Sequence, residues 1–361
     1  MMKIVFAGGG TAGHIEPALA VARLWQQNHP NDEIKFIGTA SGLENHLVPA
    51  AGFKLSHIPK VIIPRKVSPK LFKAPLTLVS SFIAARKLLN GCDLLIGFGG
   101  YVSAPAYLAA KSLAIPFVVH EANAKPGFAN RLGARLTPYC AIAQSVTKGS
   151  LEKALITGIP LRADVAHALQ QSATDWNAAR TRAKSALGFS STQPLILAFF
   201  GSQGSVALNK VISQSLPSLL ANGSQLLHAV GKLNALPAVQ ERYKSTQYIE
   251  DMATAYLAAD LIISRSGAIS CSEINALGRY ALFIPLPIGN GEQSFNAGSL
   301  VSQGRAEVLE QNRFTSDWVN SNINRLLTCA ATSSVNGSDS DALATEKIYN
   351  YMQHALNDRV R

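Results

Sequence analysis

Two glycine-rich turns, one in each half of the chain, constrain its fold more than any other feature of the sequence. The first follows the apolar run at 3–7 and reads Gly-Gly-Gly-Thr-Ala-Gly-His at 8–14. The second follows the apolar run at 194–199 and reads Gly-Ser-Gln-Gly-Ser at 201–205. Helix-forming sequence follows both turns, so each turn is expected to lead into a helix N-terminus whose free N–H groups can bind an anion. The pair predicts two Rossmann-like domains with a phosphorylated ligand at one or both turns.

The length and the order of the expected elements support two α/β domains. A chain of 361 residues is too long for one comfortable core and suits two domains of roughly 150 to 200 residues. Strand-like runs alternate with helical stretches, which predicts parallel sheets. The expected strands are 4–7, 34–38, 94–97, 117–120, 140–143, 194–199, 225–230, 261–264 and 281–285, and the expected helices include 17–27 and 208–220.

The boundary between the domains is placed where the sequence turns polar and helix-prone, at 164–187. The predicted domains are 1–162 and 163–340. A last helix within 341–361 follows a Ser-rich connector and is expected to pack on the first domain. No signal peptide and no apolar run of about 20 residues is visible, which predicts a cytoplasmic or peripheral protein. The four cysteines are scattered without a C-x-x-C pair, so neither a disulfide framework nor a structural metal is expected.

The excess positive charge is confined to the first half of the chain. The formal net charge is +11, and residues 1–163 hold 18 Lys and Arg against 7 Asp and Glu. No acidic residue lies between Glu44 and Asp93, where basic and apolar residues alternate. A stretch of this kind suits reversible attachment to an anionic membrane surface, where each Lys or Arg contributes about 1 kcal/mol at most. Its basic residues are Lys54, Lys60, Arg65, Lys66, Lys70, Lys73, Arg86 and Lys87.

Core packing is the competing interpretation of the same stretch. Phe72, Leu76, Val79 and Ile83 recur at helical spacing and would then form the buried face of a crossover helix, with the lysines in solvent. Nucleic acid is not expected as a partner, because the stretch lacks the aromatic pattern of single-strand binders and shows no recognition motif.

Gly8, Gly10 and Gly13 spell G-x-G-x-x-G, which is typical of dinucleotide-binding domains. That fingerprint also needs an acidic residue at the end of the second strand. The nearest acids, Asp32 and Glu33, precede the strand, which weakens a nicotinamide-binding interpretation. Glycine also serves strand-to-helix turns on steric grounds alone, so these residues are open to a purely structural interpretation.

Further polar motifs stand where parallel strands are expected to end, which is the edge at which open sheets bind ligands. In the second half, the segment 265–273 runs from a strand end into a helix, and offers N–H groups for phosphate and the Glu273 carboxylate for a ribose or sugar hydroxyl. His120-Glu121 is not the zinc motif H-E-x-x-H, because position 124 is alanine. The motifs are Gly-Phe-Gly-Gly-Tyr-Val-Ser at 97–103, His-Glu-Ala-Asn at 120–123, Arg-Ser-Gly at 265–267 with Ser-Glu at 272–273, and Gly-Asn-Gly-Glu-Gln-Ser-Phe-Asn at 289–296.

Taken in order with the two glycine turns, these motifs resemble the MurG family of N-acetylglucosaminyltransferases, and the likeness spans positions 3 to about 300. The resemblance implies a GT-B fold, in which two Rossmann-like domains face each other across a cleft, with no metal and no other cofactor. It implies transfer of N-acetylglucosamine from UDP-N-acetylglucosamine to the C4 hydroxyl of the muramoyl sugar of lipid I, giving lipid II. The enzyme would work at the cytoplasmic face of the membrane as a peripheral protein.

The resemblance places the donor UDP-N-acetylglucosamine mainly on the second domain. The main chain of Ile249 would bond the uracil, with Tyr248 beside it, and Glu273 would accept hydrogen bonds from the ribose. Ser202 and a helix start would hold the diphosphate, and that helix start comprises Ala268, Ile269, Ser270, Cys271 and Ser272. The other implied donor contacts are Gln293 and Asn296 for the sugar, together with Thr11, Ala12, Gly13, Asn123 and Arg162.

The resemblance places the lipid I acceptor on the first domain, its pyrophosphate against the loops at 9–13 and 99–100. The implied contacts are Gly10, Gly99, Gly100 and Tyr101, with Asn123 nearby. Transfer needs a base for the attacking hydroxyl and positive dipoles for the departing diphosphate. His14 is the first candidate for the base and Glu121 the second. The alternatives are that His14 caps its loop or bonds the acceptor phosphate, and that Glu121 organises its loop.

Two other functions stay open at this point. One is another GT-B enzyme with the same donor, either a transferase with another acceptor or a 2-epimerase. The other is a basic Rossmann-type binding protein without turnover. Three positions depart from the family pattern, namely Ala12, Ile159 and Phe200. Phe200 stands where the family has glycine, and its ring would either narrow the donor site or point into the core.

Overall fold

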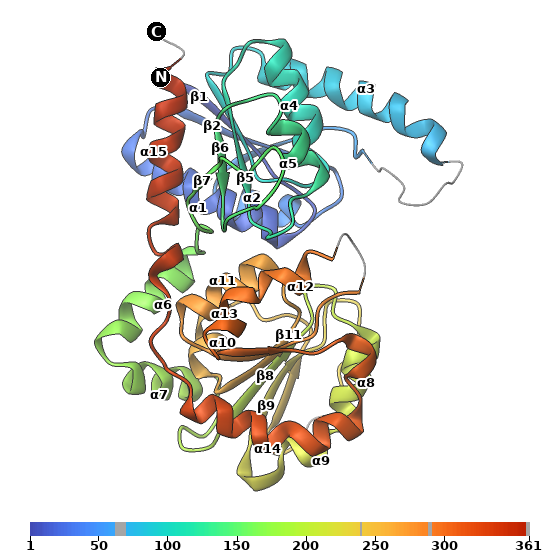
Figure 1. The fold of residues 1–361 in the computed structure, drawn as a ribbon, viewed down its shortest axis with the longest axis vertical. Helices are drawn as coiled ribbons and strands as arrows, with labels where there is room; N and C mark the ends of the chain where they lie inside the picture. The colour runs from blue at the N-terminus through green and yellow to red at the C-terminus, as the bar shows by residue number, and fades with distance from the viewer. Residues whose placement is uncertain (62–69, 239, 288–290, 359–361) are drawn as a thin grey trace. The chain divides into compact units, whose positions relative to one another are not determined.

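A computed structural model of the chain describes residues 1–61, 70–238, 240–287 and 291–358, with the backbone alone for 70–75 and 222. The chain divides into two compact units, of which unit 1 comprises 1–162 with 340–361 and unit 2 comprises 163–339. Each unit is a parallel sheet with helices on its faces (Figure 1). The expected fold class of two Rossmann-like α/β domains is confirmed. Ser340, assigned from the sequence to the second domain, groups with unit 1.

Unit 1 contains a seven-stranded sheet in the order β3-β2-β1-β4-β5-β6-β7, in which every neighbouring pair is parallel. Its central strands are apolar runs because helices cover both faces. The chain reverses its direction of winding between β1 and β4, and their carboxyl ends therefore flank a crevice. The strands are β1 (Lys3–Ala7), β2 (Glu33–Gly38), β3 (Lys54–His57), β4 (Leu94–Gly97), β5 (Phe117–Glu121), β6 (Cys140–Ile142) and β7 (Leu155–Ile156).

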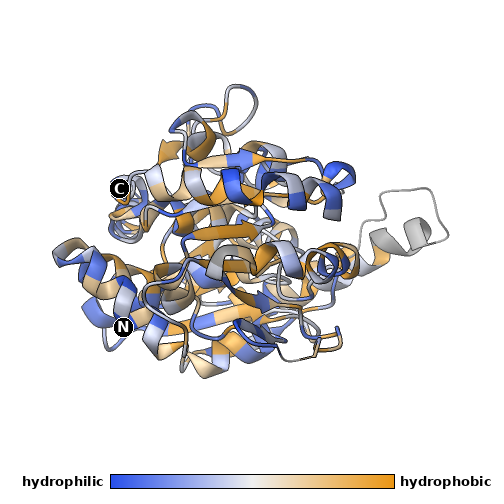
Figure 2. Cartoon of the chain, turned by 90° about the horizontal axis from the view of Figure 1, so that it is seen from below, coloured by the Kyte–Doolittle hydropathy of each residue, from blue (hydrophilic) through white to orange (hydrophobic). Residues whose placement is uncertain are grey.

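Two apolar clusters fill the two faces of this sheet. Helices α1 and α15 contribute to the cluster around Trp25, and helices α3 and α4 to the cluster around Tyr107. Figure 2 shows the strands largely in the apolar colour and the helices in mixed colours. The helices of unit 1 are α1 (Ala12–Asn28), α2 (Glu44–Ala50), α3 (Lys70–Leu89), α4 (Ser103–Ser112), α5 (Phe128–Gly133) and α15 (Ala344–Asn357).

Unit 2 repeats the same winding with six parallel strands in the order β10-β9-β8-β11-β12-β13, so its crevice lies between β8 and β11. The strands are β8 (Leu195–Phe199), β9 (Gln225–Ala229), β10 (Tyr243–Thr246), β11 (Leu261–Ser264), β12 (Tyr280–Phe283) and β13 (Ala306–Val308). The helices are α6 (Ala163–Thr174), α7 (Trp176–Ala186), α8 (Val206–Gln214), α9 (Leu216–Leu219), α10 (Met252–Ala258), α11 (Ala268–Ala276), α12 (Gln293–Asn296), α13 (Gly298–Ser302) and α14 (Ser316–Thr332).

The last helix, α15, packs against α1. Ile348 and Met352 are fully buried, and the Tyr349 ring stands edge-on to Trp25 at 5.4 Å between centroids. Where the chain re-enters unit 1, the Asp341 carboxylate accepts a hydrogen bond of 3.0 Å from the Ile159 N–H. The C-terminal segment is thus an integral part of unit 1.

Helix α3 contradicts the core-packing interpretation of its apolar stripe. Leu76, Val79 and Ile83 are 74%, 55% and 49% exposed. The helix turns a different face, with Ala85 and Leu89, into the core of unit 1. Leu76, Val79 and Ile83 therefore form an exposed apolar stripe, which we call the α3 stripe. Arg65 and Lys66, and the side chains of Lys70, Phe72 and Lys73, lie outside the described residues.

None of the helices in the described part of the chain is both long and apolar enough to cross a bilayer.

Candidate functional site

Three loops at the carboxyl ends of β1, β4 and β5 meet in unit 1. They pack so closely that a Cβ atom on Gly100 would lie 2.4 Å from the Gly9 carbonyl oxygen, and one on Gly99 would lie 3.2 Å from the His14 ring. Both residues also have φ near +90°, a conformation that favours glycine. The predicted acceptor loops at 9–13 and 99–100 are therefore in direct contact, and glycine is required there for steric reasons.

Other predicted residues line the same loops. Tyr101 is 48% exposed and has the Lys60 ammonium 4.8 Å from its ring centroid. Thr11 is the exposed N-cap residue of α1, and Ala12 and Gly13 form the first turn of that helix. Asn123 lies half-buried in the loop after β5.

The helices α1 and α11 begin at the carboxyl edges of their sheets without a side-chain cap. Thr11 precedes α1 and Gly267 precedes α11, and neither donates or accepts a capping hydrogen bond through a side chain. Other described helices are capped by Asp175, Ser205 or Thr315. An uncapped N-terminus keeps its N–H groups for an anion. The observed geometry therefore favours a phosphate site at α1 and another at α11, whereas α8 behind the second glycine turn is already capped by Ser205.

His14 is held in a defined tautomer by the first loop. Its Nδ1 lies 3.1 Å from the Gly9 carbonyl oxygen and 3.2 Å from the Thr11 hydroxyl. Because a carbonyl only accepts, Nδ1 carries the proton and Nε2 keeps its lone pair. Burial lowers the pKa of His14 below its ordinary value, and the carboxylates of Glu121 and Glu44 and the bond to Gly9 offset part of that shift. The ring is therefore neutral at pH 7 and suited to accept a proton.

The Glu121 carboxylate is held by its own loop, which fits the alternative that it organises that loop. It is 3% exposed, and its Oε1 accepts hydrogen bonds from the backbone N–H and the side-chain amide of Asn123 at 2.9 and 3.0 Å. Its Oε2 accepts from the Gly127 N–H at 2.8 Å and from Asn130 at 3.1 Å. A carboxylate that accepts four hydrogen bonds from its own loop organises that loop, so His14 is the better candidate for the base.

Sequence reasoning missed Glu44, which is fully buried beneath the first glycine loop. Its Oε2 accepts from the Gly10 N–H at 2.9 Å, and its Oε1 accepts from the N–H and the hydroxyl of Thr39, both at 3.0 Å. Burial raises the pKa of Glu44, but these hydrogen bonds lower it further than burial raises it. Glu44 is therefore an anion that fixes the loop carrying His14. Gly42 was an available signal, because any side chain there would collide with this carboxylate.

In unit 2 the loops after β8 and β9 interlock. A Cβ atom on Gly204 would lie 1.8 Å from the Val230 carbonyl oxygen, and the Lys232 N–H donates to the Ser202 carbonyl at 3.2 Å. The Lys232 ammonium lies 4.6 Å from the ring centroid of Tyr248. Ser202, predicted to hold the diphosphate, and Tyr248, predicted beside the uracil, therefore belong to one cluster, to which Lys232 adds a cation that the sequence did not reveal.

The loops after β11 and β12 complete this cluster. The Asn296 amide donates to the Ser266 carbonyl at 3.1 Å, and the Gln293 side-chain oxygen accepts from the Leu286 N–H at 3.0 Å. Ala268 to Ser272 form the first turns of α11, followed by the buried Glu273. Burial raises the pKa of the Cys271 thiol, so that residue is not a nucleophile.

The remaining predicted positions are placed as follows. Ile249 is buried just after β10, and Arg162 is the last residue of unit 1 before α6. Gly289 and Asn290 lie outside the described residues. Phe200 is 4% exposed, belongs to the apolar core of unit 2 and stands edge-on to His228 at 6.4 Å. Its ring therefore points into the core and does not narrow the donor loops.

No cluster of three or more His, Cys, Asp or Glu side chains in the described parts of the chain has the geometry to hold a metal ion. We call the loop cluster after β1, β4 and β5 the half-site of unit 1, and the loop cluster after β8, β9, β11 and β12 the UDP half-site of unit 2. The polar groups of both half-sites are backbone N–H groups, hydroxyls, amides and single charges. This donor set suits phosphate and sugar oxygens.

The family of both units identifies the class of the protein as a glycosyltransferase. The glycosyltransferase family 28 N-terminal domain matches residues 4–142, and the glycosyltransferase family 28 C-terminal domain matches residues 195–354. The first match reaches from β1 to the end of β6, and the second includes all six strands of the sheet in unit 2.

Full-length relatives narrow the class. A protein of Corynebacterium glutamicum, named UDP-N-acetylglucosamine–N-acetylmuramyl-(pentapeptide) pyrophosphoryl-undecaprenol N-acetylglucosamine transferase, is 46% identical over 87% of this chain and 86% of its own length. A Streptomyces avermitilis protein of the same name is 42% identical over 89% and 88%. The crystal structure of Acinetobacter baumannii MurG superposes with a TM-score of 0.71 at 25% identity, covering 98% of this chain and 100% of that one. The chain belongs to the MurG family of family 28 glycosyltransferases.

Proposed function

We propose that this chain transfers N-acetylglucosamine from UDP-N-acetylglucosamine to the C4 hydroxyl of the muramoyl sugar of lipid I, the undecaprenyl-pyrophosphoryl-muramoyl-pentapeptide, to give lipid II. The names of relatives at 42–46% identity support this donor and this acceptor. The observation that carries the proposal is the uncapped start of α11 at the crevice of unit 2, with the buried Glu273 behind it. An uncapped helix start suits a diphosphate and a carboxylate suits the ribose hydroxyls.

The chemistry follows from the two half-sites. The Nε2 atom of His14 takes the proton of the acceptor hydroxyl as its oxygen attacks the anomeric carbon, and the bond from that carbon to the UDP oxygen breaks. The new glycosidic bond forms opposite the departing UDP, so the configuration inverts. The negative charge that develops on the diphosphate is stabilised by the N–H groups at the start of α11 and by the loop of Ser202. Thr11, Gly13 and Asn123 complete the donor contacts, and Gly10, Gly99, Gly100 and Tyr101 contact the acceptor.

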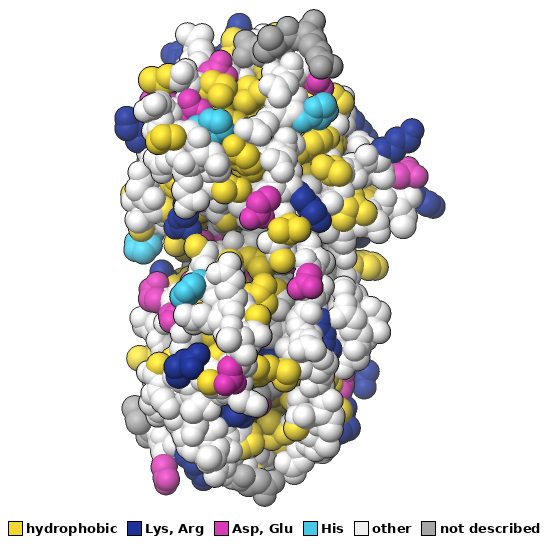
Figure 3. Space-filling model, turned by 90° about the vertical axis from the view of Figure 1, so that its left-hand side faces the viewer, with side chains coloured by type: hydrophobic (Ala, Val, Ile, Leu, Met, Phe, Trp, Pro, Cys, Tyr) yellow, Lys and Arg dark blue, Asp and Glu magenta, His cyan; other side chains and the backbone are white. Residues whose placement is uncertain are grey.

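We also propose that unit 1 attaches reversibly to the cytoplasmic face of an anionic membrane, where its lipid-linked substrate resides. The α3 stripe exposes three large apolar side chains beside the basic stretch of 54–87. On the face drawn in Figure 3, by contrast, Lys and Arg stand singly among acidic residues, so the positive excess is not gathered there. Basic and apolar groups together favour an interfacial position.

The donor site is tested by Glu273→Ala, with UDP binding measured by calorimetry. Loss of a charged acceptor of hydrogen bonds costs about 1.5 to 3 kcal/mol, so the Kd for UDP should rise at least tenfold. Glu310→Ala, which removes an exposed carboxylate from the same unit, should leave the Kd unchanged.

Near-normal UDP affinity in Glu273→Ala, with an unchanged thermal transition, would defeat the assignment of Glu273. Absence of UDP binding in the unmodified protein would instead favour a binding protein for another ligand. A 2-epimerase would use the same donor, and it differs from the proposed transferase because its release of UDP would not depend on lipid I.

A further inference from the structure

We propose that unit 2 carries a second ligand pocket, at the opposite edge of its sheet from the UDP half-site, that binds a small anionic molecule through Arg279. Arg279 immediately precedes β12, and Asp260 beside it immediately precedes β11. The donor loops follow the carboxyl ends of these strands. The two sites therefore lie at opposite ends of β11 and β12, and a strand of four residues is about 13 Å long.

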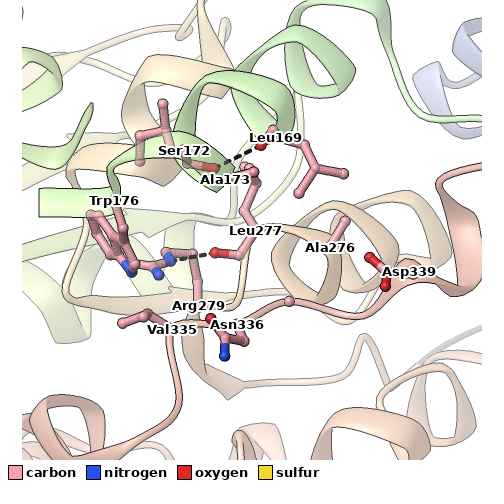
Figure 4. Close-up of a pocket in the computed structure, with 12 residues that line it drawn as sticks. Leu169, Ser172, Ala173, Trp176, Ala276, Leu277, Arg279, Val335, Asn336 and Asp339 are labelled. Atoms are coloured by element: carbon pink, nitrogen blue, oxygen red, sulfur yellow. Dashed lines mark hydrogen bonds between the residues drawn. The ribbon is translucent and has the colours of Figure 1, made fainter. Parts of the chain in front are cut away.

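The pocket is a cavity of about 480 Å³ between α6, α7, α10 and the end of α11. A smaller cavity of about 140 Å³ adjoins it and shares Trp176, Arg279 and Val335 as a common wall. Figure 4 shows Arg279 and Trp176 together on one side of the larger cavity and Asp339 on the other. All of the lining residues belong to unit 2.

Arg279 is the residue that favours an anionic ligand in this cavity. It is only 5% exposed, and its guanidinium lies on the Trp176 ring, 3.8 Å from the centroid. Within the part of the chain that the structure describes, its one hydrogen bond runs from Nε to the Leu277 carbonyl at 2.8 Å, which leaves the donors of both terminal nitrogens to the cavity. Burial lowers the pKa of Arg279 to about 9, as expected for a cation without an adequate counter-charge.

The carboxylate of Asp260, which lies near Arg279, already binds two other cations. Asp260 accepts from the Arg180 Nε at 2.8 Å, from the Lys184 ammonium at 2.7 Å and from the Leu195 N–H at 2.7 Å. Arg180, Lys184 and Arg279 are thus three cations near one carboxylate. An anionic ligand would supply the negative counter-charge that Arg279 lacks. A planar guanidinium binds carboxylates and phosphates through two parallel hydrogen bonds.

Two further donors in the walls are unused. The Trp176 indole Nε1 and the Ser333 hydroxyl are buried and have no hydrogen-bond partner among the residues that the structure describes. Unsatisfied buried donors are rare in folded proteins and are costly unless a ligand or water meets them. Both residues line the smaller cavity together with Arg279, so an acceptor-rich group bound at Arg279 would lie close to them.

The rest of the cavity defines the body of the ligand. Leu169, Leu257 and Leu277 supply apolar walls, and Asp339 stands exposed at the far rim. A molecule with a carboxylate or phosphate at one end, an apolar body, and a hydroxyl or amine at the other end matches this arrangement.

The cavity is roofed by the connector that leads from unit 2 to α15. The Asn336 carbonyl accepts from Arg305 at 3.3 Å, and the Ser338 N–H donates to the Asn275 carbonyl at 3.0 Å. A Cβ atom on Gly337 would lie 1.6 Å from the Ala276 carbonyl oxygen, so the connector is pressed onto the end of α11. Since α11 also begins at the UDP half-site, a ligand beneath the connector contacts the helix that holds the donor.

The pocket is tested by following the indole N–H signals of the full-length protein, which has three tryptophans, by two-dimensional NMR. The probes are phenyl phosphate and phenylacetate, with benzyl alcohol as the neutral control, all in saturating UDP so that the donor site is filled. The Trp176 signal, assigned with Trp176→Phe, should shift saturably with at least one anionic probe, while the signals of Trp25 and Trp318 stay fixed. Tighter binding of one probe identifies its anionic group as the preferred one.

Three variants decide the outcome. Arg279→Gln should reduce the affinity at least tenfold, Ala173→Phe should block the cavity from its rim, and Arg313→Gln, an exposed arginine of the same unit, should change nothing. If Arg279→Gln fails to fold, Ala173→Phe carries the test. Absence of a Trp176 shift, an equal response to benzyl alcohol, or shifts that persist in the folded Arg279→Gln or Ala173→Phe proteins would overturn the proposal. None of these results depends on transferase activity.

Discussion

At the scale of single residues, the proposed transfer depends most on the removal of the acceptor proton by His14. Replacing it with Gln should lower kcat by about 10²- to 10⁴-fold, the usual contribution of a general base, and leave the Kd for UDP nearly unchanged. The pKa of His14 is lowered, so the neutral base persists at neutral pH and is lost only as the pH falls below about 6.5. The pH profile of kcat/KM should therefore show an acid limb centred below 6.5 that Gln at position 14 abolishes. An unchanged limb in the variant would exclude His14.

Glu44 offers a second test at this scale. Its carboxylate raises the pKa of His14 through space, so Glu44→Gln should lower that pKa further and move the acid limb to lower pH. The amide oxygen of Gln can still accept from the Gly10 N–H, which keeps the loop in place. Glu33→Gln, at the other end of β2, is the matched control and should leave the limb where it is. A loss of stability without movement of the limb would reduce Glu44 to a purely structural role.

Residue-level prediction from the sequence reaches contiguous motifs but does not reach long-range contacts. His14, Asn123 and Glu273 stand in contiguous motifs near strand ends, and their roles in binding and catalysis stay predictions. Glu44 belongs to no motif near Gly10, and the sequence does not show that the loop after β2 returns Glu44 beneath Gly10. The four hydrogen bonds of Glu121 likewise depend on the path of a loop that no motif specifies.

At the scale of elements, the strands that the sequence missed are the edge strands. β3, β7, β10 and β13 each close one side of a sheet and are only two to four residues long. Interior strands are covered on both faces and form continuous apolar runs, such as Leu195–Phe199, which is buried throughout. Edge strands are partly exposed and carry charges, as in Lys54–His57, so they lack that pattern.

Helix α3 carries the prediction that belongs to this scale. Replacing Leu76, Val79 and Ile83 together by Ser should weaken binding to vesicles of anionic phospholipid at least tenfold, because about 1.5 to 3 kcal/mol is available for each fully buried side chain. Added salt should weaken binding of the unmodified protein, since the attraction of exposed charges is screened. Co-sedimentation with vesicles measures both effects.

The matched control for α3 uses exposed apolar residues of unit 2. Val206, Leu233 and Leu236 are 77%, 84% and 53% exposed, and their replacement by Ser should not change vesicle binding. Equal loss in both triple variants, or no loss in the α3 variant, would contradict a specific membrane face on unit 1.

At the scale of the whole molecule, one winding pattern is used twice, with strand orders that correspond over six strands, and β7 of unit 1 has no counterpart in unit 2. The glycine turns predicted this duplication because each marks the first strand of a doubly wound sheet. The positive excess of the chain belongs to unit 1 alone, which fits a lipid-linked acceptor there and a soluble nucleotide sugar on unit 2. The extent of the second cavity was beyond sequence reasoning, since its wall joins residues between 169 and 339 that share no motif.

The most direct test of the central claim is the release of UDP from UDP-N-acetylglucosamine, measured with and without lipid I in detergent or vesicles. We predict release that depends on lipid I and yields a β-1,4-linked disaccharide on the lipid. Tight UDP binding without lipid I-dependent release would contradict the proposed acceptor. Equal release in the absence of lipid I, with N-acetylglucosamine epimerised at C2, would identify an epimerase instead.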